Sequence, residues 1–194
     1  MTRADLIALL ERYFDAHREE RATTRRILDL VESEPRCFER DCYAPGHVTA
    51  SAWIVSRESR AVLLTHHRKL DRWLQLGGHT DGESDVLRSA LREAREESGL
   101  VELVPIPAAG GPVILDLDVH AIPARKAEPA HAHHDIRFLL EASEAAPLAR
   151  QEAESKALQW FPMEGVAARF PEESLARMAR KAARWLAQVP PGPV

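Results

Sequence analysis

The chain has 194 residues, of which 45% are hydrophobic and 29% are charged, and its formal net charge is −4 with histidine counted as neutral. This length predicts one domain with a small extension, and the composition excludes a disordered chain. The mild acidity gives no general electrostatic attraction to nucleic acid or to an anionic membrane, so we expect neither as a partner.

Simple counts disfavour two further classes of protein. Cys37 and Cys42 are too few for a disulfide scaffold, and we expect both to be free thiols. No run of residues approaches the ~20 apolar positions that a membrane helix needs. Because nothing in the composition points to secretion, we expect a cytoplasmic protein.

The first part of the chain predicts helix, then linker, then strands. Apolar side chains recur at helical spacing over residues 3–32, with a break near residues 17–24. Prolines and a glycine within residues 33–46 predict a linker. Residues 48–56 and 61–67 then predict two strands.

The remainder predicts one central helix among further strands. We expect a Gly/Asp-rich loop over residues 76–85, then a helix that runs to about Ser98 and stops at Gly99. The other predicted elements are three strands and a last helix, over residues 113–122, 135–142, 156–161 and 171–188. Because several strands have few helices between them, this order favours an α+β fold.

The N-terminal segment carries an apolar stripe that has to be buried. Its members are Leu6, Leu9, Leu10, Tyr13 and Phe14. They must pack on the rest of the chain or on a second copy, so a homodimer is one way to cover them. We therefore expect a helical extension over residues 1–45, a main domain over residues 46–189 and a flexible tail over residues 190–194.

Three carboxylates crowd one region of the predicted central helix. Glu93, Glu96 and Glu97 are spaced i, i+3 and i+4, which places them within an arc of about 100°. Like charges this close repel one another in water. A hard divalent cation such as Mg²⁺ would convert that repulsion into binding, since it takes carboxylate oxygens, waters and substrate phosphates. Ahead of the helix, Gly77 and Gly78 allow close backbone approach.

This stretch resembles the sequence box of the Nudix hydrolase family. The matching positions are Gly78, Arg92, Glu93, Ala94, Glu96, Glu97, Gly99 and Leu100. The chain departs from the box at Ser84, where the family has Glu, and the adjacent Glu83 is a candidate substitute. Leu76 also stands where many members have Pro before the two glycines.

The resemblance implies a Nudix-type α/β/α sandwich with a mixed central sheet. It implies a hydrolase that cleaves the diphosphate of a nucleoside diphosphate linked to another moiety, with Mg²⁺ as cofactor and Mn²⁺ as the alternative. The implied metal ligands are the Gly77 carbonyl, Glu93, Glu96 and Glu97. Catalytic roles are implied for Glu93, Glu97, Glu154 and Arg92. Of these, Arg92 would orient a helix carboxylate, and Glu154 would act as an extra ligand or general base.

Several side chains flanking the box are candidates for substrate binding, namely Arg68, Lys69, Trp73, His79 and His133. The two cations at a strand end could bind phosphate, and the indole could wall the pocket or stack on a base. The alternatives are a solvated turn for the cations and a core position for the ring. A zinc site made only from the run His131, His133 and His134 is awkward, because neighbours in a strand point to opposite faces.

Two other functions remain open on the residues alone. The altered box position Ser84 leaves room for a non-catalytic sensor that binds a nucleotide. An isoprenoid diphosphate isomerase shares the fold in some members, but it typically needs a cysteine near the pocket, and both cysteines here precede the first predicted strand. The substrate also stays open among ADP-ribose, nucleotide sugars, CDP-alcohols, nucleoside triphosphates and dinucleoside polyphosphates.

Overall fold

The computed structural model describes residues 1–58, 60–108, 110–125 and 128–188. Its helices are α1 (Arg3–Ala16), η1 (Arg18–Glu20), α2 (Arg21–Ser33), α3 (Val86–Ser98), η2 (Met163–Gly165), α4 (Val166–Arg169) and α5 (Glu173–Gln188). Its strands are β1 (His47–Ser56), β2 (Ala61–His67), β3 (Arg72–Leu74), β4 (Leu76–His79), β5 (Val104–Pro105), β6 (Pro107–Ala108), β7 (Gly111–Pro112), β8 (Ile114–Ile122), β9 (His131–Glu141) and β10 (Ser155–Pro162). The mixture confirms the predicted α+β class.

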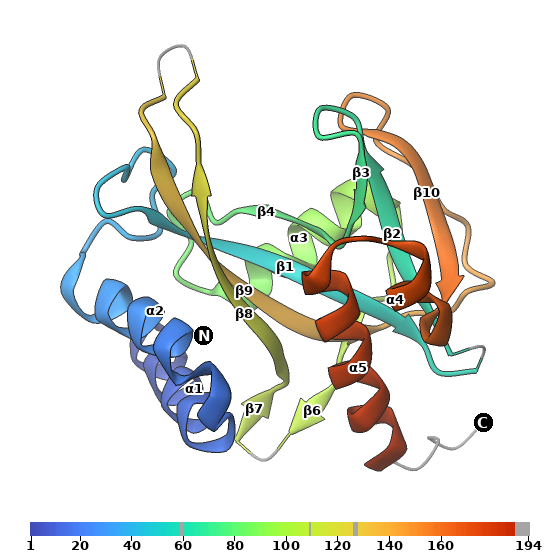
Figure 1. Cartoon of the computed structure of the whole chain (residues 1–194), viewed down its shortest axis with the longest axis horizontal. Coiled ribbons are helices and arrows are strands. Elements are labelled where there is room, and N and C mark those ends of the chain that lie inside the picture. The colour runs from blue at the N-terminus through green and yellow to red at the C-terminus, as the bar shows by residue number, and fades with distance from the viewer. Residues whose placement is uncertain (59, 109, 126–127, 189–194) are drawn as a thin grey trace.

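A mixed sheet forms the centre of the molecule (Figure 1). Its hydrogen-bonded order is β10-β2-β1-β9-β5, with β3 on β2, β4 on β1 and β8 on β9. The β1–β9 pair is parallel, and the other pairs in this sheet are antiparallel. Strand β1 is therefore central, and all of its residues are buried.

Strand β1 separates two hydrophobic cores, because successive side chains of a strand point to opposite faces. Val48, Ala50, Ala52 and Ile54 join the core that holds the apolar faces of α1, α2 and α3. Trp53, which points to the opposite face, joins the core under α4 and α5. This layering matches the sandwich that the sequence resemblance implies.

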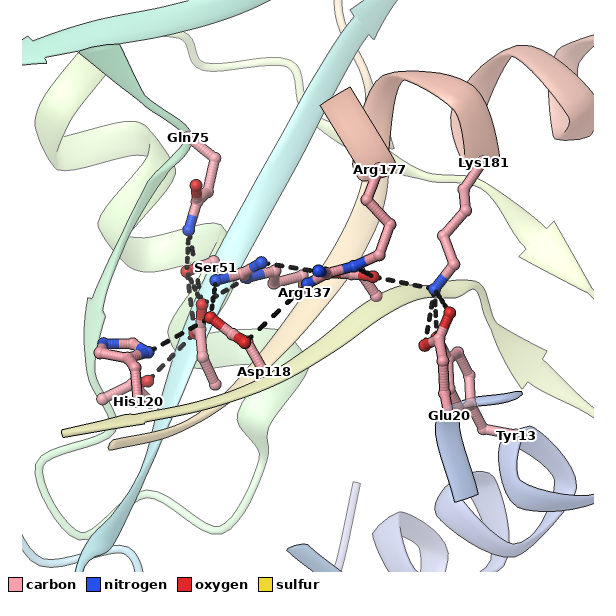
Figure 2. A network of polar contacts seen from close by, with 12 residues as sticks. Tyr13, Glu20, Ser51, Gln75, Asp118, His120, Arg137, Arg177 and Lys181 are labelled. Carbon is pink, nitrogen blue, oxygen red and sulfur yellow. Dashed lines mark hydrogen bonds and ion pairs between the residues drawn. The ribbon is translucent and has the colours of Figure 1, made fainter. Parts of the chain in front are cut away.

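The N-terminal extension is part of the first core. Leu6, Leu10 and Tyr13 of α1 are buried within this chain, so the apolar stripe needs no second copy to cover it. Figure 2 shows a polar network that also binds the extension. The Lys181 ammonium of α5 lies 2.6 Å from a Glu20 carboxylate oxygen and 2.8 Å from a carboxylate oxygen of Asp116 in β8.

The structure differs from the sequence predictions in a few places. The segment predicted as a loop over 76–85 begins with strand β4, and the last helix begins at Glu173 rather than at residue 171. Strand β9 begins at His131, four residues earlier than predicted, so the whole histidine run lies in a strand. The break in the N-terminal helix is confirmed. The predicted tail over 190–194 lies outside the described residues.

Among the residues that the structure describes, no helix combines the length and the apolar character needed to cross a bilayer.

Candidate functional site

Helix α3 carries the carboxylates, and its ends are fixed by local chemistry. The Asp85 side chain accepts a hydrogen bond from the Arg88 backbone N–H at 3.1 Å, which satisfies one of the free donors of the first turn. Gly99 ends the helix in the left-handed conformation with φ 73°, where a side chain would be strained. The helix packs against β1 and against β4, and β4 carries the two glycines.

The two glycines of β4 bring its backbone into contact with the helix carboxylates. A Cβ atom at Gly78 would lie 2.5 Å from Glu93 Oε2, so the missing side chain leaves the space that this carboxylate occupies. One residue earlier, the Gly77 N–H donates to Glu97 Oε2 at 3.2 Å. At Gly77 itself, φ is +149° and a Cβ atom would lie 2.5 Å from the Ala50 carbonyl oxygen. Gly78 therefore makes room for the Glu93 carboxylate, whereas Gly77 lies too close to the backbone of β1 to carry a side chain.

Glu97 is the most deeply buried of the three helix carboxylates, with 8% of its surface exposed. Burial raises its pKa to about 8, and the negative charges of Glu93, Glu154 and Glu96 add to that rise. The pKa of Glu93 is also raised, first by burial. Glu96 is different, since 52% of its side chain is exposed. The repulsion predicted for this group is therefore strongest between the buried Glu97 and the half-buried Glu93.

Arg92 holds one carboxylate in place and ties the helix to the end of β4. Its Nη1 lies 2.6 Å from Glu93 Oε1 and 3.5 Å from Glu96 Oε2. Its Nη2 donates to the His79 carbonyl at 2.8 Å. A guanidinium with several fixed donors suits this bridging position.

Glu154 comes from a distant part of the chain, in the turn just before β10. Its charge raises the pKa of both Glu93 and Glu97, so it lies within electrostatic reach of the helix carboxylates. The residue that follows β2 anchors this turn. The Arg68 N–H donates to the Glu154 carbonyl at 2.7 Å, and Arg68 Nε donates to the Glu152 carbonyl at 2.9 Å.

These residues fit a magnesium ion. The donors are oxygens only, which is what Mg²⁺ prefers, and the buried Glu97 lies near the half-buried Glu93. A buried carboxylate with its pKa raised by like charges is stabilised by a cation among them. The predicted ligands that would hold it are the Gly77 carbonyl, Glu93, Glu96 and Glu97, with Glu154 beside them as an extra ligand or general base.

The replaced box position does not leave a gap in the loop before α3. Glu83 Oε1 accepts from the Asp85 N–H at 3.0 Å, and Glu83 Oε2 lies 3.4 Å from Arg88 Nη1. The Glu83 side chain thus supports the first turn of the helix. Ser84 follows it, partly exposed, just before the helix cap.

The predicted substrate residues fall into two groups. Arg68, Lys69 and Trp73 lie around the turn between β2 and β3, where the Trp73 ring stacks on His66 with centroids 5.1 Å apart and meets Phe161 edge-on at 4.8 Å. His79 and His133 lie together beside the first residues of β1, with ring centroids 5.2 Å apart. The structure does not gather all five into one place.

Sequence reasoning missed a buried ionic hub on β9. Arg137 is 3% exposed and contacts Asp135, Asp116 and Asp118 at 2.7 to 2.9 Å, and Figure 2 shows it reaching toward α5. Asp135 also accepts from the hydroxyls of Thr49 and Ser51. No spacing rule reveals this hub, because its members are joined by strand register rather than by sequence neighbourhood.

The cysteines are unsuited to proton transfer in the site. Cys37 is fully buried in the first core, and burial raises the pKa of its thiol to about 11. Cys42 is buried in the segment before β1, and burial raises the pKa of its thiol as well. Both are free thiols, as expected.

Comparison with known proteins places this geometry in one family. The family model for the NUDIX domain matches residues 45–186. A NUDIX-family hydrolase from Clostridium perfringens is 24% identical, with 72% of this chain and 97% of that chain covered and a TM-score of 0.53. The dihydroneopterin triphosphate pyrophosphohydrolase of E. coli is 17% identical, with 73% and 96% covered and a TM-score of 0.54.

A third structure, the Ap4A hydrolase of C. elegans in a binary complex, is 16% identical, with 73% of this chain and 99% of that chain covered and a TM-score of 0.50. At these identities the likeness concerns the fold. No curated protein matched the chain.

Proposed function

The chain belongs to the Nudix family of pyrophosphohydrolases, and we propose that it cleaves the diphosphate bond of a nucleoside diphosphate linked to another moiety, with Mg²⁺ as its metal. The observation that carries this proposal is the group of carboxylates on α3, whose negative charges repel one another. Glu97 is buried and Glu93 is half-buried, their charges repel each other, and both lie against the two glycines of β4. A diphosphate brings further negative charge, which such a site accommodates only together with a cation.

Metal chemistry explains why these side chains are arranged in this way. When bound, Mg²⁺ would neutralise the phosphate oxygens, polarise phosphorus and lower the pKa of a water. Glu97 is held by the Gly77 N–H at 3.2 Å and Glu93 by Arg92 at 2.6 Å, so both carboxylates keep fixed positions as ligands. Arg92 would act by positioning Glu93.

Glu154 is the better candidate for the base that takes a proton from the attacking water. Glu93 already pairs with Arg92, whose Nη1 lies 2.6 Å from Glu93 Oε1, and this ion pair holds the carboxylate away from a role in proton transfer. Glu154 comes from a separate turn, so it can approach the phosphate from outside the helix. Its turn is held by Arg68 through backbone carbonyls.

The substrate class is proposed from charge and from the names of the fold neighbours. Two of these are named for Ap4A and for dihydroneopterin triphosphate, and both compounds carry a phosphate chain in a molecule with an aromatic heterocycle. The test panel therefore contains a dinucleoside polyphosphate, a nucleoside triphosphate, a nucleotide sugar, ADP-ribose and a CDP-alcohol. Release of phosphate or nucleoside monophosphate is measured with Mg²⁺, with Mn²⁺ and with chelator.

The decisive variant is Glu97→Gln, with Glu102→Gln as its matched control. Glu102 follows α3 and is exposed, so its substitution leaves the site untouched. We expect Glu97→Gln to lower kcat by at least about 100-fold, and Glu102→Gln to leave it unchanged. Normal turnover by Glu97→Gln would overturn the assignment. Nucleotide binding by calorimetry with no turnover on any substrate would favour the sensor instead.

A further inference from the structure

Three histidines from distant parts of the chain meet on one face of the sheet. His47 is directly opposite His133 in the parallel β1–β9 pair, and His79 is opposite Thr49 in the β1–β4 pair. Because side chains two residues apart in a strand share a face, all three point to the same side. One ring nitrogen from each lies within 4.8 Å of the other two. We call His47, His79 and His133 the three-histidine cluster.

His47 has one nitrogen satisfied and one that lacks a partner. It is 1% exposed, and its Nδ1 lies 3.2 Å from the Cys42 carbonyl oxygen. A carbonyl only accepts, so Nδ1 carries the proton and Nε2 presents a lone pair. Within the described part of the chain, nothing donates a hydrogen bond to this buried Nε2. A buried acceptor without a donor costs free energy, which a bound cation would recover.

His131 repeats this arrangement at the edge of the cluster. Its Nδ1 lies 2.8 Å from the Pro129 carbonyl oxygen, which fixes the proton on that nitrogen. Its Nε2 then presents a lone pair, 3.3 Å from Nε2 of His133. Imidazoles that bind metals commonly donate their other N–H to a carbonyl or carboxylate in this manner. His131 is therefore available as a fourth ligand.

We propose that the three-histidine cluster binds a divalent transition-metal ion, with Zn²⁺ as the best-matched ion and His131 as a further ligand. Neutral imidazoles suit zinc, copper, nickel or iron and are poor ligands for Mg²⁺. Zinc–nitrogen bonds of about 2.0–2.1 Å place tetrahedral ligands about 3.3 Å apart. Small side-chain rotations would bring the nitrogens, now within 4.8 Å, to that spacing.

This site is separate from the carboxylates, although both involve β4. Gly78 faces Glu93 and α3, whereas the next side chain, His79, points to the opposite face. Arg92 touches both sides, since it pairs with Glu93 and donates to the His79 carbonyl. A metal on the histidines would therefore tie β4 to β1 and β9 without using a catalytic carboxylate. The inference does not depend on the proposed hydrolase activity.

The cluster lies near an open hollow of the surface. The His131 ring lies 5.2 Å from that of Tyr43, and Tyr43 lines an open hollow of about 370 Å³ together with Arg40 and Asp81. We expect an ion to enter from this side, where His131 and His133 are half-buried.

The experiment is metal titration of the full chain after treatment with chelator. Calorimetry with Zn²⁺ gives stoichiometry and affinity, Co²⁺ absorption reports the ligand geometry, and thermal melting reports stabilisation. We expect one Zn²⁺ per chain, a raised Tm, and a Co²⁺ spectrum of low coordination number. Mg²⁺ should produce none of these effects at the histidines.

Variants locate the ion. His133→Gln replaces a half-buried ligand and should weaken Zn²⁺ binding by about 100-fold or more, and His131→Gln should weaken it less. His66→Gln, on β2 and outside the cluster, is the matched control and should bind normally. Glu97→Gln should also bind Zn²⁺ normally, which separates this result from any failure of the hydrolase assignment. Absence of stoichiometric Zn²⁺ binding, or equal binding by His133→Gln and His66→Gln, would overturn the proposal.

Discussion

Replacing Gly78 with alanine tests whether the position of Glu93 matters for turnover. The added Cβ would lie 2.5 Å from Glu93 Oε2 and 2.6 Å from its Cδ, whereas ordinary contacts begin at 3.4 Å. The carboxylate must therefore move by about 1 Å, and a displacement of this size can cost about 100-fold in rate. That is about 2.7 kcal/mol of lost transition-state stabilisation. The atoms that move are the end of a flexible side chain, so the fold should persist.

Two other glycines supply the controls. Gly165→Ala places its Cβ in open space, so both activity and stability should be kept. Gly77→Ala meets the backbone of β1 at 2.5 and 2.6 Å and occupies φ +149°, so it should destabilise the protein strongly. We expect Gly78→Ala to resemble Gly165→Ala in Tm and to differ from it in kcat.

The assay combines steady-state kinetics on the best substrate of the panel with thermal melting of each variant. A Gly78→Ala protein with the melting temperature of wild type and a kcat within about twofold of it would refute the reasoning. It would mean that the carboxylate of Glu93 can shift without consequence, and hence that it does not hold the metal in the reacting complex.

Three further predictions rest on other contacts. In metal-free protein, the raised pKa of Glu97 gives stability that is present below pH 4.5 and is lost as the pH rises through about 8. Glu97→Gln should therefore raise Tm above pH 8 and leave it unchanged below pH 4.5. An equal change in Tm at both pH values would contradict this prediction. Asp116→Asn removes the one carboxylate that Arg137, Arg177 and Lys181 share, and it should cost about 3–5 kcal/mol by urea unfolding. The exposed Asp29→Asn should cost under about 1 kcal/mol, and similar costs for the two variants would mean that the shared carboxylate adds little stability. Arg68→Met should loosen the turn of Glu154 and lower kcat by about 10-fold at unchanged KM, whereas a rise in KM alone would mean that Arg68 contacts the substrate.

Local chemistry determined the parts of the molecule that lie within a few residues of one another. The cap at Asp85, the stop at Gly99 and the helical spacing of the three glutamates are all legible in the sequence, because helix formation and capping depend on neighbours. The family resemblance of the box also follows from that short stretch. For β4, local reasoning failed, because two adjacent glycines favour a loop unless a neighbouring strand pairs with them.

Tertiary structure decided everything that depends on strand register. Glu97 is buried because β4 lies over it, and its spacing along the helix could not reveal that burial. The sequence draws attention to the histidine run that begins at residue 131, in which neighbours alternate between faces. Yet the cluster that forms takes His47 and His79 from other strands and only His133 from that run. Pairing between strands joins residues dozens of positions apart, and no local pattern encodes which residue stands opposite which.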